Sequence, residues 1–193
     1  MNRQDFWDLV AAARDHVARD QVARDQVARD QVQAPYPCEA IAGAATTLLA
    51  SRPAEEIVAA EEVLWDLMSE SYTNPLWAAA YQINGGWSDD GFDYFRGWLI
   101  AQGREVFELA VAEPDALAEL PVVQTAAALG IDLEGEDVLA IAWDAHIAAT
   151  GNQLPADQPK IQYPQLDPDW NFSFDDRGEM ARRLPRLAAL FRE

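Results

Sequence analysis

Apolar residues recur along most of the chain at spacings of three and four, the pattern of helices that bury one face. It starts with Phe6, Trp7, Val10 and Ala13 and predicts a first helix from Asp5 onward. Runs in which apolar and polar residues alternate, as they do along a half-buried strand, are absent from the sequence. The chain is therefore predicted to be a single all-α domain of about seven or eight helices.

A tandem repeat lengthens the first helix. The sequence ARDHV, followed by three copies of ARDQV, runs from Ala13 to Val32. Each five-residue step turns about 140° around a helix axis, so the repeated valines form neither one stripe nor a coiled-coil seam. Aspartate and arginine four residues apart favour a helix, which we expect to continue to about Gln33, where two prolines follow. Residues 18–33 are interpreted as an inserted, exposed extension; the alternative is an arm that binds a partner.

The remaining helices are predicted between turn and capping signals. Ser51 is the expected N-cap of the helix that ends at Glu70, because a serine followed by acidic residues is typical of a helix start. Residues 152–176 contain four prolines and no helical period, and they are predicted to form an extended surface strap before the last helix. The other helices are expected at 39–49, 75–83, 88–102, around 106–110, 121–129, 136–150 and 178–191, with a short helical turn at 113–120.

The stretch LWAAAYQINGGWSDDGFDYFRGWLIAQGRE, residues 76–105, is the expected focus of the fold. Asn-Gly-Gly predicts a tight turn with positive φ between two helices. The second helix should bury Phe92, Phe95, Trp98 and Leu99, and Tyr94 is a further candidate for that face.

Charge excludes several classes of partner. The 193 residues carry a formal net charge of −19, whereas nucleic-acid and anionic-lipid binding require clustered Lys and Arg. Two interpretations remain: a protein kept in solution by its charge, or an acidic face that receives a basic protein partner.

Cysteine content and hydropathy bear on location. Cys38 is the single cysteine, so neither an internal disulfide nor a zinc site built from several thiolates can form. The charged start is unlike a signal peptide, and no stretch approaches the roughly 18–20 apolar residues that span a membrane. A cytoplasmic location is expected, without membrane association.

A group of acidic residues with one arginine is the candidate site. Asp89, Asp93 and Arg96 have spacings that place them on one helix face, and Asp90 adjoins them. Clustered carboxylates could hold a divalent cation or act as acid and base, but the simpler interpretation is helix capping, with Arg96 neutralising Asp93. Trp87, at the turn, is a candidate lid or partner contact.

Other candidates for chemistry are weak. His146 has no second histidine at ligand spacing, His16 belongs to the repeat, and Cys38 has no evident histidine partner. Phosphate-loop, zinc-protease and dinucleotide-binding motifs are absent, so no cofactor and no metal are expected.

The long motif is similar to that of a known family. LWAAAYQINGGWSDDGFDYFRGWLIAQGREVFELAVAEPDAL resembles the signature of the bacterial DUF4240 domain, a domain of unknown function. FWDLVAAAR, RPAEEI and the C-terminal FSFDDRGEMARRLPRLAALF are also similar, the last to longer members, whereas residues 18–32 and parts of the strap depart from the pattern. Trp87 stands where many relatives have cysteine, which argues against an essential thiol. The resemblance implies a mostly helical domain and carries over no activity.

Two functions are therefore expected as alternatives. The first is a non-enzymatic interaction or regulatory module whose acidic surface near Trp87–Asp93 binds a basic protein. The second is a metal-dependent or acid–base enzyme that uses Asp89, Asp90 and Asp93, with Arg96 as an anion clamp.

Overall fold

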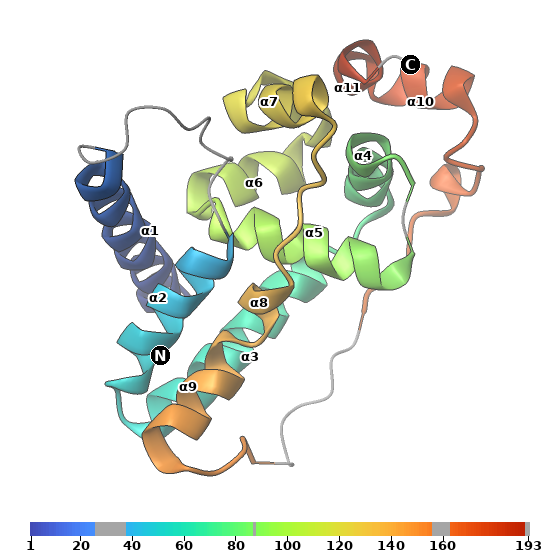
Figure 1. Ribbon diagram of the computed structural model, residues 1–193. Helices are drawn as coiled ribbons and strands as arrows, with labels where there is room; N and C mark the ends of the chain where they lie inside the picture. The colour runs from blue at the N-terminus through green and yellow to red at the C-terminus, as the bar shows by residue number, and fades with distance from the viewer. Residues whose placement is uncertain (26–37, 87, 156–162, 192–193) are drawn as a thin grey trace.

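The computed structural model describes residues 1–25, 38–86, 88–155 and 163–191. These residues form α-helices and two short 3-10 helices, and no strand occurs among them (Figure 1). The all-α class predicted from the sequence is confirmed. In chain order the elements are α1 (Arg3–Asp25), α2 (Cys38–Ala50), α3 (Ala54–Glu70), α4 (Asn74–Asn84), α5 (Asp89–Ala101), α6 (Arg104–Ala112), η1 (Pro114–Glu119), α7 (Pro121–Leu129), α8 (Glu136–Leu139), α9 (Ile141–Thr150), η2 (Pro168–Trp170), α10 (Arg177–Arg183) and α11 (Pro185–Leu190).

The described residues form more helices than predicted, in part because two expected helices are each divided. The expected helix at 136–150 turns at Ala140, which separates α8 from α9 and lets α8 lie on α5 while α9 packs on α2 and α3. The last helix divides at Leu184 because Pro185 lacks the amide hydrogen that a continuous helix needs. Leu184 accordingly leaves helical geometry, with φ −128° and ψ 62°.

The predicted cap at Ser51 is wrong. Its hydroxyl donates to the carbonyl oxygen of Leu48 at 2.7 Å, so Ser51 belongs to the end of α2. Pro53 takes the N-cap position of α3 and has no side chain to cap with. The proline fixes φ where the backbone enters the helix, but it supplies no side-chain capping hydrogen bond.

The first helix is amphipathic as predicted. Phe6, Trp7, Val10 and Ala13 are all buried in the core. α1 runs through the first repeats to Asp25, and the expected continuation to Gln33 lies outside the described residues. α1 packs along α2, which lies in turn against α9 (Figure 1).

Helix α5 crosses the middle of the molecule (Figure 1). Phe92, Phe95, Trp98 and Leu99 are buried as expected, with at most 3% of each side chain exposed. Tyr94 instead lies half-buried at the surface, where its hydroxyl is 3.1 Å from the Glu136 Oε1 atom. The buried face of α5 therefore joins the helices on both of its sides into one core.

The segment that leads from α7 into α8 is fastened across α5. The side-chain amide of Asn84 exchanges two hydrogen bonds with the backbone of Leu133, at 3.0 and 3.3 Å. The Gly135 amide donates to the Tyr94 carbonyl oxygen at 2.9 Å. A Cβ on Gly97 would overlap the Gly135 carbonyl oxygen, so the two backbones are in direct contact. The side chain of Leu133, which belongs to this segment, is buried in the core.

We predict that Gly97→Ala destabilises the protein by about 1–3 kcal/mol, because the added methyl group meets backbone that has no room to move. Gly43→Ala is the matched control. Nothing lies within 4 Å of a Cβ at that position of α2, so alanine should stabilise by about 0.5–1 kcal/mol. Urea unfolding of both variants measures the difference. Equal effects of the two substitutions would show that the backbones at the crossing are not in contact.

Candidate functional site

The first turn of α5 carries two of the candidate residues. Asp89 and Asp90 are exposed at the helix start, where their negative charge interacts favourably with the positive end of the helix dipole. Ser88 occupies the N-cap position, but its side chain makes no capping hydrogen bond. Trp87 lies outside the described residues. The acidic first turn is therefore present as predicted, without a serine cap.

Arg96 is a fully buried residue, with 0% of its side chain exposed. Its Nη2 pairs with the Asp93 carboxylate, the pairing that the sequence predicts. Its Nη1 donates to the Met68 carbonyl oxygen at the end of α3, and its Nε lies 3.4 Å from the Phe92 carbonyl oxygen. Arg96 thus fastens α5 to α3 from inside the core.

Aromatic rings cover the Arg96 guanidinium. Its central carbon lies 4.6 Å from the ring centre of Phe92, 5.1 Å from that of Tyr72 and 5.5 Å from that of Tyr163. Such contacts between a cation and ring faces are attractive. Tyr163 comes from the strap and also packs on Tyr72, with ring centres 4.3 Å apart. A guanidinium enclosed in this way has no exposed edge for an anion.

Asp89, Asp93 and Arg96 lie around one tyrosine. Burial, and next the charge of Asp89, raise the pKa of Tyr72, whereas Arg96 lowers it. The hydrogen bond to Glu136 is the main cause of the raised pKa of Tyr94, and the charges of Asp90 and Asp93 raise it further. Asp93 therefore acts on both tyrosines, and it is also the carboxylate that pairs with Arg96.

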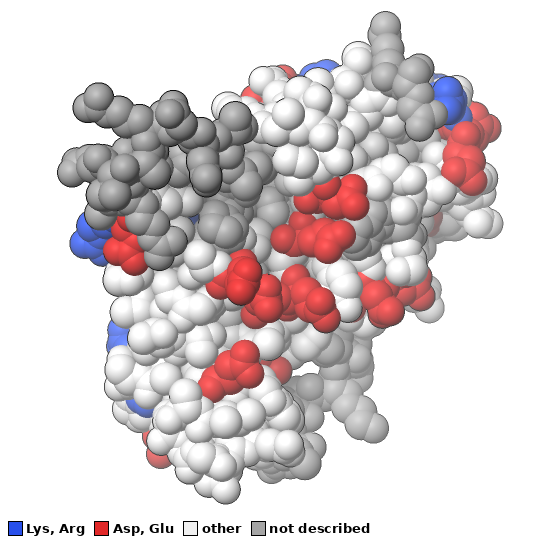
Figure 2. All heavy atoms as spheres, in the orientation of Figure 1, with Lys and Arg blue, Asp and Glu red and all other residues white. Residues whose placement is uncertain are grey.

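An acidic band continues from Asp90 over α8. Figure 2 shows acidic side chains gathered across the middle of this face, along α8 and the segment before it, with no Lys or Arg between them. We call five exposed carboxylates of this region the acidic band: Asp90, Asp132, Glu134, Glu136 and Asp137. The charges of Asp90 and Glu136 raise the pKa of Tyr94, and those of Asp132 and Glu136 raise the pKa of Glu134.

The carboxylates of the acidic band lack counter-charges. None of the five forms an ion pair within the described parts of the chain. No Lys or Arg occurs in the sequence between Arg104 and Lys160. Burial, and then the charges of Asp132 and Glu136, raise the pKa of Glu134. Mutual repulsion of this kind is relieved when a cation binds.

The described residues contain no group of side chains arranged to hold a metal ion, and the histidine and cysteine candidates have structural surroundings. No three His, Cys, Asp or Glu side chains there lie close enough to hold a metal ion. The His146 Nδ1 atom is 2.9 Å from the Asn152 carbonyl oxygen, which fastens the turn after α9. Cys38 is buried, and burial followed by the charge of Asp137 raises its pKa to about 12.

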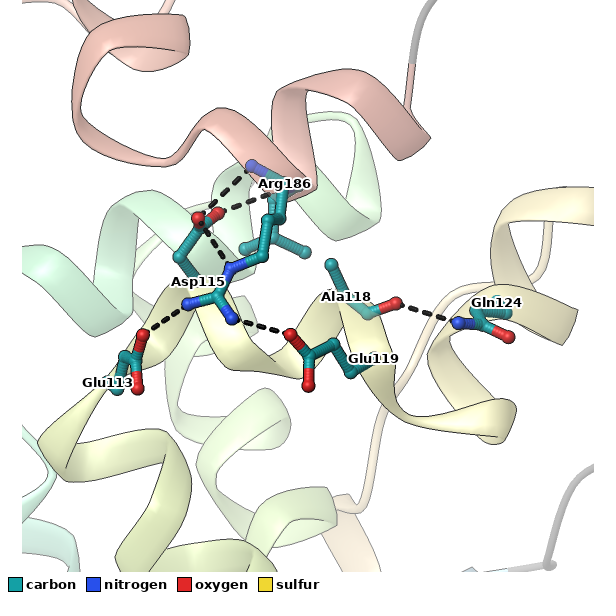
Figure 3. A network of polar contacts seen from close by, with 7 residues as sticks. Glu113, Asp115, Ala118, Glu119, Gln124 and Arg186 are labelled. Atoms are coloured by element: carbon teal, nitrogen blue, oxygen red, sulfur yellow. Dashed lines mark hydrogen bonds and ion pairs between the residues drawn. The ribbon is translucent and has the colours of Figure 1, made fainter.

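A second charged cluster joins η1 to α11. Arg186 forms ion pairs with Glu113, Asp115 and Glu119, which all come from η1 or the residue before it (Figure 3). The Nη1–Glu119 and Nε–Asp115 distances are 2.6 and 3.1 Å. These hydrogen bonds raise the pKa of Arg186. Sequence reasoning missed this cluster because its partners lie about seventy residues apart.

Comparison with known proteins identifies the family. Residues 1–147 match the family described as "Protein of unknown function (DUF4240)", and this match covers more than half of the chain. The chain belongs to the DUF4240 family. No curated protein and no solved structure matches it.

The end of the DUF4240 match falls between Arg186 and the carboxylates that pair with it. The acidic band and the three carboxylates around Arg186 lie within the matched residues. Arg186 itself, and Tyr163 over Arg96, belong to residues 148–193, beyond the match. In the described parts of the chain, none of the helices has the length and apolar character needed to cross a membrane.

Two neighbouring carboxylates provide a matched pair for mutation. Asp93→Asn should destabilise the protein by about 1–2 kcal/mol, because it weakens a charge-assisted hydrogen bond to a buried guanidinium. Asp90→Asn should change stability by less than about 0.5 kcal/mol, because Asp90 is exposed and has no ion-pair partner among the described residues. Thermal and urea unfolding report both values. Equal losses would contradict the pairing of Arg96 with Asp93.

The raised pKa of Cys38 predicts an unreactive thiol. Folding favours the protonated form, so the thiolate should appear only as the pH approaches 12, compared with 9.0 for an ordinary thiol. At pH 9, a chromogenic disulfide reagent should label the folded protein at least about a hundredfold more slowly than the urea-unfolded protein. Similar rates in the two states would contradict the burial of this thiol.

Proposed function

We propose that this DUF4240 protein is a non-enzymatic interaction or regulatory module whose acidic band binds a basic protein partner. The observation that carries the proposal is a row of five exposed carboxylates without an ion pair among the described residues. A surface of one sign attracts a partner of the opposite sign and raises its rate of association.

The backbone beneath the acidic band supports this role. Three of its carboxylates, those of Asp132, Glu134 and Glu136, lie on or next to the segment that Asn84 and Tyr94 hold against α5. A rigid display of charge reduces the entropy lost when a partner binds. The band is therefore suited to recognise a fixed pattern of basic side chains.

The enzyme alternative has weaker support. It requires Arg96 to reach an anion, but this side chain is buried and its guanidinium pairs with Asp93. Asp89 and Asp90 remain exposed in the first turn of α5. The proposed module acts in the cytoplasm, consistent with a chain that contains a single, buried cysteine.

A labelled peptide of alternating arginine and alanine tests the proposal. Fluorescence anisotropy should show binding that weakens with added salt. A variant with four neutralised carboxylates of the acidic band should bind at least about tenfold more weakly, since several charge contacts are lost together. These substitutions are Asp90→Asn, Asp132→Asn, Glu134→Gln and Glu136→Gln.

A control variant separates a specific surface from net charge. It neutralises four exposed carboxylates on other helices and so has the same total charge: Glu55→Gln, Glu62→Gln, Asp66→Asn and Glu105→Gln. Its affinity should stay within about twofold of the unmodified chain. Equal losses in the two variants would show that only net charge attracts the peptide and would refute the proposal.

A further inference from the structure

The C-terminal segment is basic and packs on the acidic body of the protein. Residues 177–193 contain five of the fourteen Lys and Arg residues of the chain and two of the thirty-three Asp and Glu residues. α11 packs against η1 and α4, and α10 adjoins α11 (Figure 1). This segment lies beyond the DUF4240 match, whereas η1 and α4 lie within it. The basic segment thus lies outside the family match, and the helices that it contacts lie within it.

One carboxylate of η1 completes the start of α11. Leu184 is the N-cap residue and has no polar side chain, and Pro185 has no amide hydrogen. The amides of Arg186 and Leu187 donate instead to the Asp115 carboxylate, at 3.1 and 2.9 Å. Asp115 therefore provides the capping interaction that residues such as Ser or Asp normally provide within a helix.

Three carboxylates surround the guanidinium of Arg186. Asp115 lies under its Nε, while Glu113 and Glu119 take the two terminal nitrogens (Figure 3). The Asp115 side chain is 11% exposed, whereas those of Glu113 and Glu119 are 61% and 68% exposed. Three negative charges around one positive charge leave an excess that favours a cationic ligand.

Apolar contacts accompany the charge recognition. Met180, Leu184 and Leu187 are buried, with at most 2% of each exposed. The receptor side is itself fixed, since Gln124 of α7 donates to the Ala118 carbonyl oxygen of η1 at 3.1 Å (Figure 3). An arginine at the start of a helix, flanked by leucines, thus meets a matching surface.

We propose that η1 forms a binding site for an arginine-led helix, which the chain's own C-terminal segment occupies and which a basic helix of a separate protein takes by displacing it. The recognised pattern is a leucine, a proline that starts the helix, an arginine for the three carboxylates and a leucine for the core. This site is separate from the acidic band, and its test does not depend on the function proposed above.

Displacement is tested with a labelled peptide that has the sequence of residues 177–191. The full-length Arg186→Glu chain, whose own tail is repelled by the three carboxylates, should bind the peptide. The unmodified chain should bind it at least about tenfold more weakly, because its attached tail competes at high effective concentration. Adding Asp115→Asn to the Arg186→Glu chain should weaken binding at least about tenfold, because the helix amides and the arginine lose their shared acceptor.

Two control peptides test the recognition itself. An Arg186→Glu peptide should fail to bind, whereas an Arg182→Glu peptide of equal charge should bind normally, since Arg182 pairs within its own helix with Glu179. If both peptides lost affinity equally, the binding would depend only on net charge, and the proposal would be overturned.

Three further outcomes would overturn it. One is a folded Arg186→Glu chain that does not bind the peptide. Another is an Arg186→Glu chain that is unfolded by circular dichroism, which would make the tail an inseparable part of the core. The last is sedimentation showing that the unmodified chain is a dimer and the Arg186→Glu chain a monomer, because the occupant would then be the tail of a second copy.

Discussion

The structure depends on the crossing of the α7–α8 segment over α5, where Gly97 and Gly135 bring two backbones into contact. The crossing ties α8, and with it α9, to the helix at the centre of the core. Only glycine fits there, because a Cβ on Gly135 would lie 2.5 Å from the Trp98 nitrogen. The same crossing holds the backbone that bears most of the acidic band, so it also positions part of the surface charge.

Charge is distributed along the sequence in a way that the structure explains. The body of the protein is strongly acidic, and its C-terminal segment is basic and docks on it through Arg186. Asp115 both caps α11 and binds this arginine, so one buried carboxylate orders the docked helix. Exposed ion pairs contribute little by themselves, but a network that also satisfies helix amides is specific in direction and register. Recognition of basic helices is thus a property that this fold already displays within its own chain.

Sequence patterns predicted the features that depend on residues close together in the chain. The buried face of α5, from Phe92 to Leu99, followed from helical periodicity, and the pairing of Asp93 with Arg96 followed from their spacing. The division at Leu184 was missed, although Pro185 is a local signal that a helix cannot continue. Contacts distant in sequence were not readable: the burial of Arg96 depends on Met68, and the capping of α11 depends on Asp115. The charged candidates were therefore placed on the correct helix, while the complete burial of Arg96 could be seen only in the tertiary structure.

Amide hydrogen exchange of Leu133 and Gly135 tests most directly whether the acidic band is held rigidly. Both amides donate hydrogen bonds to partners outside their own segment, Leu133 to Asn84 and Gly135 to Tyr94. If the crossing is as tight as its geometry indicates, both should exchange as slowly as the buried amides of α5, at a rate limited by global unfolding. Exchange of either amide at the rate of an unprotected surface loop would contradict the account.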